Sequence, residues 1–268
     1  MALTPYDWNQ SLQTRLEFVE ERLRDGSPVV AIGRDDGIYV LSVHRTRRKI
    51  FEIYDRLLFA GIGAQSDLET MRTAAIDFAH REGYTRSPDD VTGFRLVSSA
   101  LSPALKRAYG DPFTAPLVFR GLFGELGETP AQDSFYTLGF DGDFRTDSSF
   151  SVVAGSLAAE NRMLEVLHAG LAEATEREST LRLALKVWGT GRLHSRSAPT
   201  QVRSNAVEDE LDDAVEARDI TVEQILRDEI SAGTVEVAFL DRMTHRESKF
   251  RLLTAEECAP LLAEHAHE

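Results

Sequence analysis

The chain has very little cysteine and no long apolar run. Among its 268 residues there is one cysteine, Cys258, which excludes an internal disulfide framework and is typical of a reducing cytoplasm. No uninterrupted apolar stretch approaches the roughly 20 residues of a membrane-spanning helix. The amino-terminal residues Met-Ala-Leu-Thr-Pro-Tyr-Asp lack the basic and apolar regions of a signal peptide. The sequence therefore predicts a cytoplasmic protein with no membrane partner.

Sequence motifs for nucleotides and metals are also missing. There is no Gly-Lys-Ser/Thr phosphate loop, and Gly61-Ile-Gly63 lacks the third glycine of a dinucleotide-binding turn. The seven histidines are scattered, and one cysteine cannot build a structural zinc site. Asp141, Asp143 and Asp147 lack the spacing of a calcium loop. We expect no metal and no cofactor.

The charge and size of the chain limit the partners and the domain organisation that can be expected. A net charge of −14 would repel nucleic acids and anionic membranes. Hydrophobic residues make up 42% of the sequence, which is enough for a sizeable core. We expect a single globular domain over residues 1–268 with no nucleic-acid partner.

Hydrophobic periodicity indicates alternating blocks of strands and helices. Leu12, Leu16, Val19 and Leu23 recur at helical spacing and predict a helix over residues 6–24, ended by Asp25-Gly26. Strands are expected at residues 29–32, 38–43, 117–126, 134–139, 150–154, 235–240 and 249–253, the first two joined by the turn Asp35-Asp36-Gly37. Further helices are expected at 66–80, from about 87 to 109 with a break near Pro103, at 158–173, at 179–188 and from 255 onward.

Two details of this pattern are specific enough to test. Ser66-Asp-Leu-Glu69 is a capping-box pattern, and Gly83 is expected to close the helix that it opens. The order of blocks does not follow the βαβ rhythm of a parallel sheet. It favours an α+β fold, a four-layer αββα sandwich of two antiparallel sheets preceded by an N-terminal helix.

A polar and acidic segment separates the last strands from the rest. Residues 194–205 are rich in Ser, Thr and Arg and predict a loop, and residues 207–230 are strongly acidic. Possible helical anchors are Leu211, Val215, Ile225, Leu226 and Ile230. A solvated helix is the favoured interpretation, with a docking role as the alternative.

Four stretches in a fixed order carry a family resemblance. They are Lys49-Ile-Phe-Glu-Ile-Tyr-Asp-Arg56, Phe59-Ala-Gly-Ile-Gly-Ala64, Phe135-Tyr-Thr-Leu-Gly-Phe-Asp-Gly142 and Phe150-Ser-Val-Val-Ala-Gly155. In this order they closely resemble proteasome α-type subunits, especially those of actinobacteria. The resemblance runs from residue 5 to 191 and resumes over 235–253, so residues 194–232 resemble an insertion. It implies the fold of N-terminal-nucleophile hydrolases without the nucleophile.

The resemblance also implies a role. Such a chain forms a homo-heptameric ring, stacks on catalytic proteasome β subunits, gates the access of unfolded protein substrates and docks a regulatory ATPase. Residues 1–26 would be a gating tail plus the N-terminal helix, with Pro5, Tyr6 and Asp7 in the gate ahead of that helix. The matching positions for the activator pocket are Lys49 and Gly63, and for the loop that narrows the channel Tyr109 and Gly110.

Other interpretations of the same residues stay open. Lys49 and Gly63 also fit a surface lysine and a turn glycine, residues 3–7 a frayed terminus, and Tyr109-Gly110 a plain turn. A self-processing hydrolase would use Ser27 as the nucleophile, with Lys49, after cleavage following Gly26. The ordered helix before Ser27 argues against an expendable propeptide. A homologue that assembles alone for another binding task would have the same sequence features.

Overall fold

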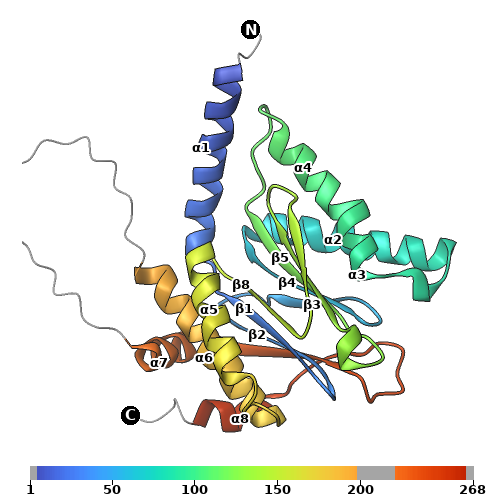
Figure 1. Ribbon diagram of the computed structural model, residues 1–268, viewed down its shortest axis with the longest axis vertical. Coiled ribbons are helices and arrows are strands. Elements are labelled where there is room, and N and C mark those ends of the chain that lie inside the picture. The colour runs from blue at the N-terminus through green and yellow to red at the C-terminus, as the bar shows by residue number, and fades with distance from the viewer. Residues whose placement is uncertain (1–4, 198–220, 264–268) are drawn as a thin grey trace, which may run out of the picture.

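The structure, a computed structural model, describes residues 5–197 and 221–263 and contains two antiparallel sheets (Figure 1). Strands in the first sheet follow the order β10-β9-β2-β1-β8, and those in the second the order β3-β4-β5-β6-β7. The strands are β1 (Val29–Arg34), β2 (Gly37–His44), β3 (Ile50–Tyr54), β4 (Leu57–Gly63), β5 (Phe119–Glu125), β6 (Ser134–Gly139), β7 (Phe144–Asp147), β8 (Phe150–Val153), β9 (Thr234–Asp241) and β10 (Phe250–Leu252).

Helices cover the outer faces of both sheets (Figure 1). The α-helices are α1 (Pro5–Arg24), α2 (Gln65–Thr85), α3 (Gly93–Arg95), α4 (Ser102–Gly110), α5 (Leu157–Gly170), α6 (Arg177–Ser197), α7 (Val222–Ala232) and α8 (Ala255–Ala263). Helices α5 and α6 lie on the first sheet and α2 to α4 on the second. The expected four-layer αββα sandwich with an N-terminal helix is confirmed. None of the helices in the described ranges is both long enough and apolar enough to cross a membrane.

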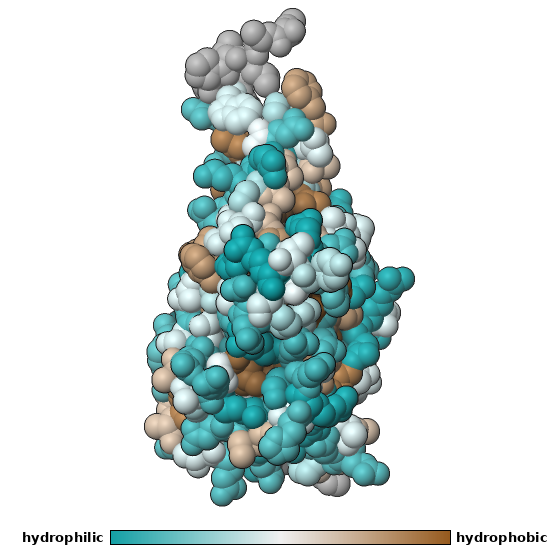
Figure 2. Space-filling view, turned by 90° about the vertical axis from the view of Figure 1, so that its right-hand side faces the viewer, coloured by the Kyte–Doolittle hydropathy of each residue, from teal (hydrophilic) through white to brown (hydrophobic). Residues whose placement is uncertain are grey.

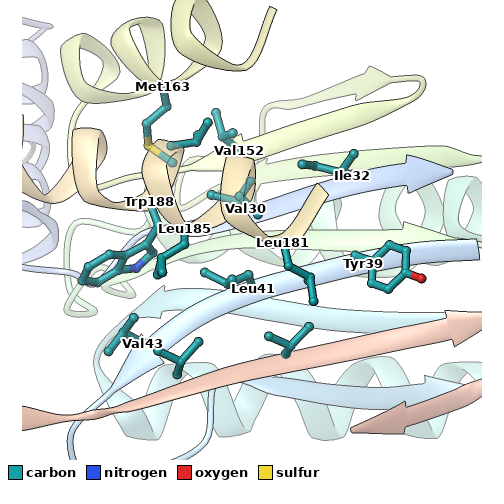
Figure 3. Packing of buried hydrophobic residues seen from close by; sticks show 14 of the residues in the cluster. Val30, Ile32, Tyr39, Leu41, Val43, Val152, Met163, Leu181, Leu185 and Trp188 are labelled. Carbon is teal, nitrogen blue, oxygen red and sulfur yellow. The ribbon is translucent and has the colours of Figure 1, made fainter. Parts of the chain in front are cut away.

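Three apolar layers hold the sandwich together. Between the first sheet and its helices, Trp188 and Leu185 of α6 pack over the β1–β2 face, and Met163 of α5 joins them (Figure 3). Between the two sheets lies a second layer, to which α1 contributes Val19 and Leu23, both fully buried. The third layer lies between the second sheet and α2 to α4. The last turns of the N-terminal helix are therefore part of the core, whereas its first turns project from the body of the molecule (Figure 1).

The first hairpin forms at the expected turn. Arg34 pairs with Gly37, which leaves Asp35 and Asp36 as the loop. Gly37 has φ +150, and a β-carbon there would lie 2.0 Å from the carbonyl oxygen of Leu240. Only glycine allows β9 to approach β2 this closely.

The expected start and end of helix α2 are wrong. The helix begins at Gln65 with Ala64 as its N-cap and no side-chain cap, so Ser66 lies inside the first turn and its hydroxyl donates to Asp67. At the other end the helix continues through Gly83 to Thr85. A β-carbon at Gly83 would lie 2.4 Å from the hydroxyl of Tyr54, so this glycine permits a close contact with β3.

Two other elements also differ from expectation. The loop expected from residue 194 is wrong for residues 194–197, which continue α6 to Ser197; most of the remaining segment, with Leu211 and Val215, lies outside the described residues. Strand β7 was not expected. The break near Pro103 takes the form of a π-helical turn, Leu96–Leu101, directly before α4.

A buried ion pair ties the two sheets together at the end away from α1. Asp133 accepts two hydrogen bonds from Arg242, at 3.0 and 2.7 Å, and a third from the backbone of Gly127 at 2.9 Å. Arg242 also donates to the carbonyl oxygens of Arg34 and Asp35. Side-chain exposure is 9% for Arg242 and zero for Asp133. The loop after β9 is thus fixed to both sheets.

Candidate docking pocket

A hollow of about 410 Å³ opens where α1 ends. The end of α1, the α1–β1 connection, the end of β2, the β2–β3 connection, the end of β4, α6 and α7 all contribute to its wall. It brings together three residues that the sequence singled out, namely Ser27, Lys49 and Gly63. The full lining is Arg22, Asp25, Gly26, Ser27, Val43, His44, Arg45, Lys49, Gly63, Arg192 and Glu229.

Lys49 is held at the start of β3 by its backbone. Its amide nitrogen donates to Glu236 of β9 at 2.8 Å, and its ammonium donates to the carbonyl oxygen of Ser27 at 3.2 Å. Burial lowers the pKa of Lys49 to about 8; Arg192 lowers this pKa further, and Glu236 opposes the shift. The hollow therefore contains an ammonium whose charge depends on pH near neutrality.

Gly63 lets the end of β4 lie close to the backbone of Val118, directly before β5. It has φ +139, and a β-carbon there would lie 2.0 Å from the carbonyl oxygen of Val118. The same carbonyl accepts a hydrogen bond from Ala64 at 2.9 Å. The glycine is required by backbone contact, and its position also opens the side of the hollow.

The hydroxyl of Ser27 is already engaged in the intact chain. It donates to the carbonyl oxygen of Val43 at 2.5 Å and accepts from the indole nitrogen of Trp188 at 3.2 Å. Its backbone nitrogen is a peptide nitrogen, so the free amine that would serve as base is absent before cleavage. Cleavage after Gly26 would also remove Val19 and Leu23 from the core.

Four charged residues of the hollow, Arg22, Arg45, Arg192 and Glu229, were not predicted from the sequence. Glu229 of α7 accepts from Arg192 of α6 at 2.8 Å and from Arg45 at 3.1 Å. Arg192 also donates to the carbonyl oxygen of Asp25 at 2.9 Å. The ion-paired residues come from segments up to 184 positions apart, so no local pattern links them. The one sequence signal for Glu229 was its helical spacing from Ile225 and Leu226, which places it on the buried face of α7.

The other predicted site residues lie elsewhere. Pro5, Tyr6 and Asp7 belong to the first turns of α1, which begins at Pro5, so the expectation that they precede the helix is wrong. Tyr109 and Gly110 end α4. The Tyr109 hydroxyl donates to the carbonyl oxygen of Leu12 at 3.3 Å and its ring lies 5.4 Å from that of Phe140. Tyr109 therefore joins α1 to the second sheet.

The hollow has no arrangement for a metal. No group of three or more His, Cys, Asp or Glu residues within the described ranges could hold an ion. Four cationic side chains line the hollow, Arg22, Arg45, Lys49 and Arg192, against two carboxylates, Asp25 and Glu229. Such a site is suited to an incoming carboxylate, which accepts charge-assisted hydrogen bonds from these donors.

Comparison with known proteins identifies the family. No family model matches the chain. It is 32% identical to the proteasome subunit alpha of Actinosynnema mirum over 185 residues, which cover 68% of each chain. The chain belongs to the proteasome α-subunit family. Its similarity to the α subunits of Kineococcus radiotolerans (29% identical, 95% of this chain and 94% of the relative) and Thermobifida fusca (27%, 95% and 88%) covers nearly its whole length.

Membership of the α-subunit family agrees with the architecture. The two antiparallel five-stranded sheets, the outer helices and the N-terminal helix are those of the proteasome sandwich that the resemblance implied. The expectation of a bacterial α-type subunit is confirmed.

Proposed function

We propose that this proteasome α-type subunit is non-catalytic and forms the outer ring of a core particle in the cytoplasm. The ring, of seven copies, stacks on catalytic β subunits, gates the access of unfolded proteins and docks a regulatory ATPase. The 268 residues act as one domain, with residues 1–26 as gating tail and helix and residues 194–232 as an insertion. The hollow at Lys49 is the observation that carries this proposal.

The hollow fits the carboxyl terminus of a partner protein. A terminal carboxylate meets the Lys49 ammonium without strict geometry, because an ammonium has three rotatable donors. The hollow also adjoins the end of α1, whose other end carries the proposed gate residues Pro5, Tyr6 and Asp7. A partner that fills the hollow would thus contact the helix that leads to the gate.

The surface of α1 supports assembly into a ring. Trp8 and Phe18 are 36% and 43% exposed on this helix, and Phe113 beside the proposed channel loop at Tyr109-Gly110 is 91% exposed. Apolar side chains also stand among hydrophilic ones at the narrow end of the molecule, where α1 and the end of α4 lie (Figure 2). Large exposed aromatic residues are favoured at the centre of protein interfaces.

Native mass spectrometry tests the assembly. The purified chain, alone and mixed with a β subunit from the same organism, is expected to give rings or a larger particle built from full-length protomers. Full-length monomers under both conditions would contradict the ring. A protomer that begins at Ser27 would instead favour the alternative function, a self-processing hydrolase that uses Ser27 and Lys49.

Lys49→Met is expected to weaken docking of the ATPase about 10- to 100-fold, because one charge-assisted hydrogen bond to a carboxylate is lost. The measurement is the affinity of assembled particles for the ATPase. Lys49→Arg is the charge-preserving control and should retain part of the binding. Equal affinity for Lys49→Met and the parent chain would exclude Lys49 as the carboxylate receptor.

Docking is also expected to depend on pH. Lys49 is charged below its pKa of about 8 and neutral above it, so affinity should fall as the pH rises through this value. The measurement is the dissociation constant of a peptide with the ATPase carboxyl-terminal sequence at several pH values. In Lys49→Arg the decline near pH 8 should disappear; its persistence would assign the pH dependence to another group.

A further inference from the structure

The proposed docking hollow already contains a carboxylate of its own. Glu229 is 3% exposed, and its two carboxylate oxygens accept hydrogen bonds from Arg192 at 2.8 Å and from Arg45 at 3.1 Å. These arginines are two of the four cationic residues that line the hollow. Donors that an incoming carboxylate would otherwise meet are therefore engaged by the chain itself.

Helix α7 holds Glu229 in this position by contacts independent of the ion pairs. Thr221 and Gln224 form a complete capping box at its start. Ile225 and Leu226 are buried, and Leu226 packs on α6 at Gly189, where a β-carbon would lie 3.0 Å from it. Glu229 is thus presented to the hollow by a well-anchored helix.

The two arginines differ in their freedom to move. Side-chain exposure is 12% for Arg192, which also binds the carbonyl oxygen of Asp25, and 57% for Arg45. Arg45 can therefore turn towards a ligand if Glu229 no longer attracts it. The Lys49 ammonium, by contrast, donates to an uncharged acceptor, the carbonyl oxygen of Ser27.

We propose that Glu229 is an internal competitor that limits the affinity of the hollow for an incoming carboxyl terminus. It holds Arg45 and Arg192 and repels a second carboxylate, which leaves Lys49 and Arg22 to receive the carboxyl terminus. Helix α7 lies in the segment 194–232, so this segment sets the affinity of the hollow. The inference rests on the proposed docking function.

The test is the affinity of the full-length chain for a fluorescent peptide with the carboxyl-terminal sequence of the ATPase, as the free acid and as the amide. Glu229→Gln is expected to bind the free acid about tenfold more tightly than the parent chain, since two arginines are released. It should bind the amide no better. Glu223→Gln, on the exposed side of the same helix, is the matched control and should not change the affinity.

A double-mutant cycle separates competition from damage to the fold. Arg45→Gln should cost more affinity in the Glu229→Gln background, where Arg45 is released, than in the parent background, where Glu229 holds Arg45. Unchanged or weaker free-acid binding by folded Glu229→Gln, or equal effects of Arg45→Gln in both backgrounds, would overturn the inference. If Lys49→Met binds as well as the parent chain, the docking function itself fails; if no variant binds, both fail.

Discussion

Gly63→Ala is expected to lower the free energy of unfolding by about 2–5 kcal/mol, from backbone strain and overpacking together. The residue has φ +139, where an alanine is strained whatever the space around it. The new methyl carbon would also lie 2.0 Å from the carbonyl oxygen of Val118 and 2.8 Å from its carbonyl carbon. Both atoms belong to the backbone beside β5, so the clash cannot be relieved by rotating a side chain. Urea unfolding of the isolated chain measures the effect.

Gly110→Ala is the matched control for this prediction. A β-carbon at Gly110, the last residue of α4, would have no heavy atom within 4 Å. The same substitution there should be neutral or stabilise by up to about 1 kcal/mol, because alanine restricts the unfolded chain. Equal unfolding midpoints for the two variants would show that the tight approach of β4 to Val118 does not exist.

Asp133→Ala is expected to cost about 3–5 kcal/mol, because it leaves the guanidinium of Arg242 buried without its counter-ion. The Asp133 side chain has zero exposure, and its two oxygens accept three hydrogen bonds. Losing them should loosen the contact between the β9–β10 loop and the second sheet. The readouts are the urea midpoint and faster hydrogen exchange in that loop.

An exposed ion pair provides the comparison for Asp133. Arg162 and Glu165 are 2.8 Å apart with side-chain exposures of 58% and 63%. Glu165→Ala should cost less than about 1 kcal/mol, since solvent screens such pairs. A similarly small loss of stability for Asp133→Ala would mean that water replaces the carboxylate as the partner of Arg242.

The strands could be predicted from the sequence because their pattern is local. The runs at β1, β2 and β9 are β-branched and apolar, and all three strands form as expected. Strand β7 was missed because Phe-Arg-Thr-Asp has no apolar alternation and gains its place by pairing with β6. Short exposed strands depend on their neighbours more than on their own residues.

Helix ends were harder to predict, because a glycine can either end a helix or allow close packing within it. Gly189 and Gly191 suggest that α6 stops near Trp188, yet the helix runs to Ser197. A β-carbon at Gly191 would lie 2.3 Å from the sulfur of Met163, so this glycine allows α5 and α6 to pack closely. Sequence alone cannot separate a packing glycine from a terminating one.

Part of the candidate site could be anticipated and part could not. Lys49 and Gly63, which the family resemblance assigned to one pocket, and Ser27, the nucleophile of the alternative, line the same hollow because they flank strands of the two facing sheets. Arg192 and Glu229 come from helices that meet only in the folded chain. Their ion pair could therefore not be predicted from the sequence.

The strand order also dictates when each sheet can form during synthesis. The second sheet uses residues 50–147 without interruption, whereas the first needs β9, residues 234–241, beside β2. The ribosome must therefore make most of the chain before the first sheet is complete, and distant pairings of this kind form slowly. Until then the inner apolar face of the second sheet lacks its full cover. We expect nascent chains that stop before β9 to depend on chaperones, which protease sensitivity of stalled chains would measure; early resistance over β1 and β2 would contradict this order.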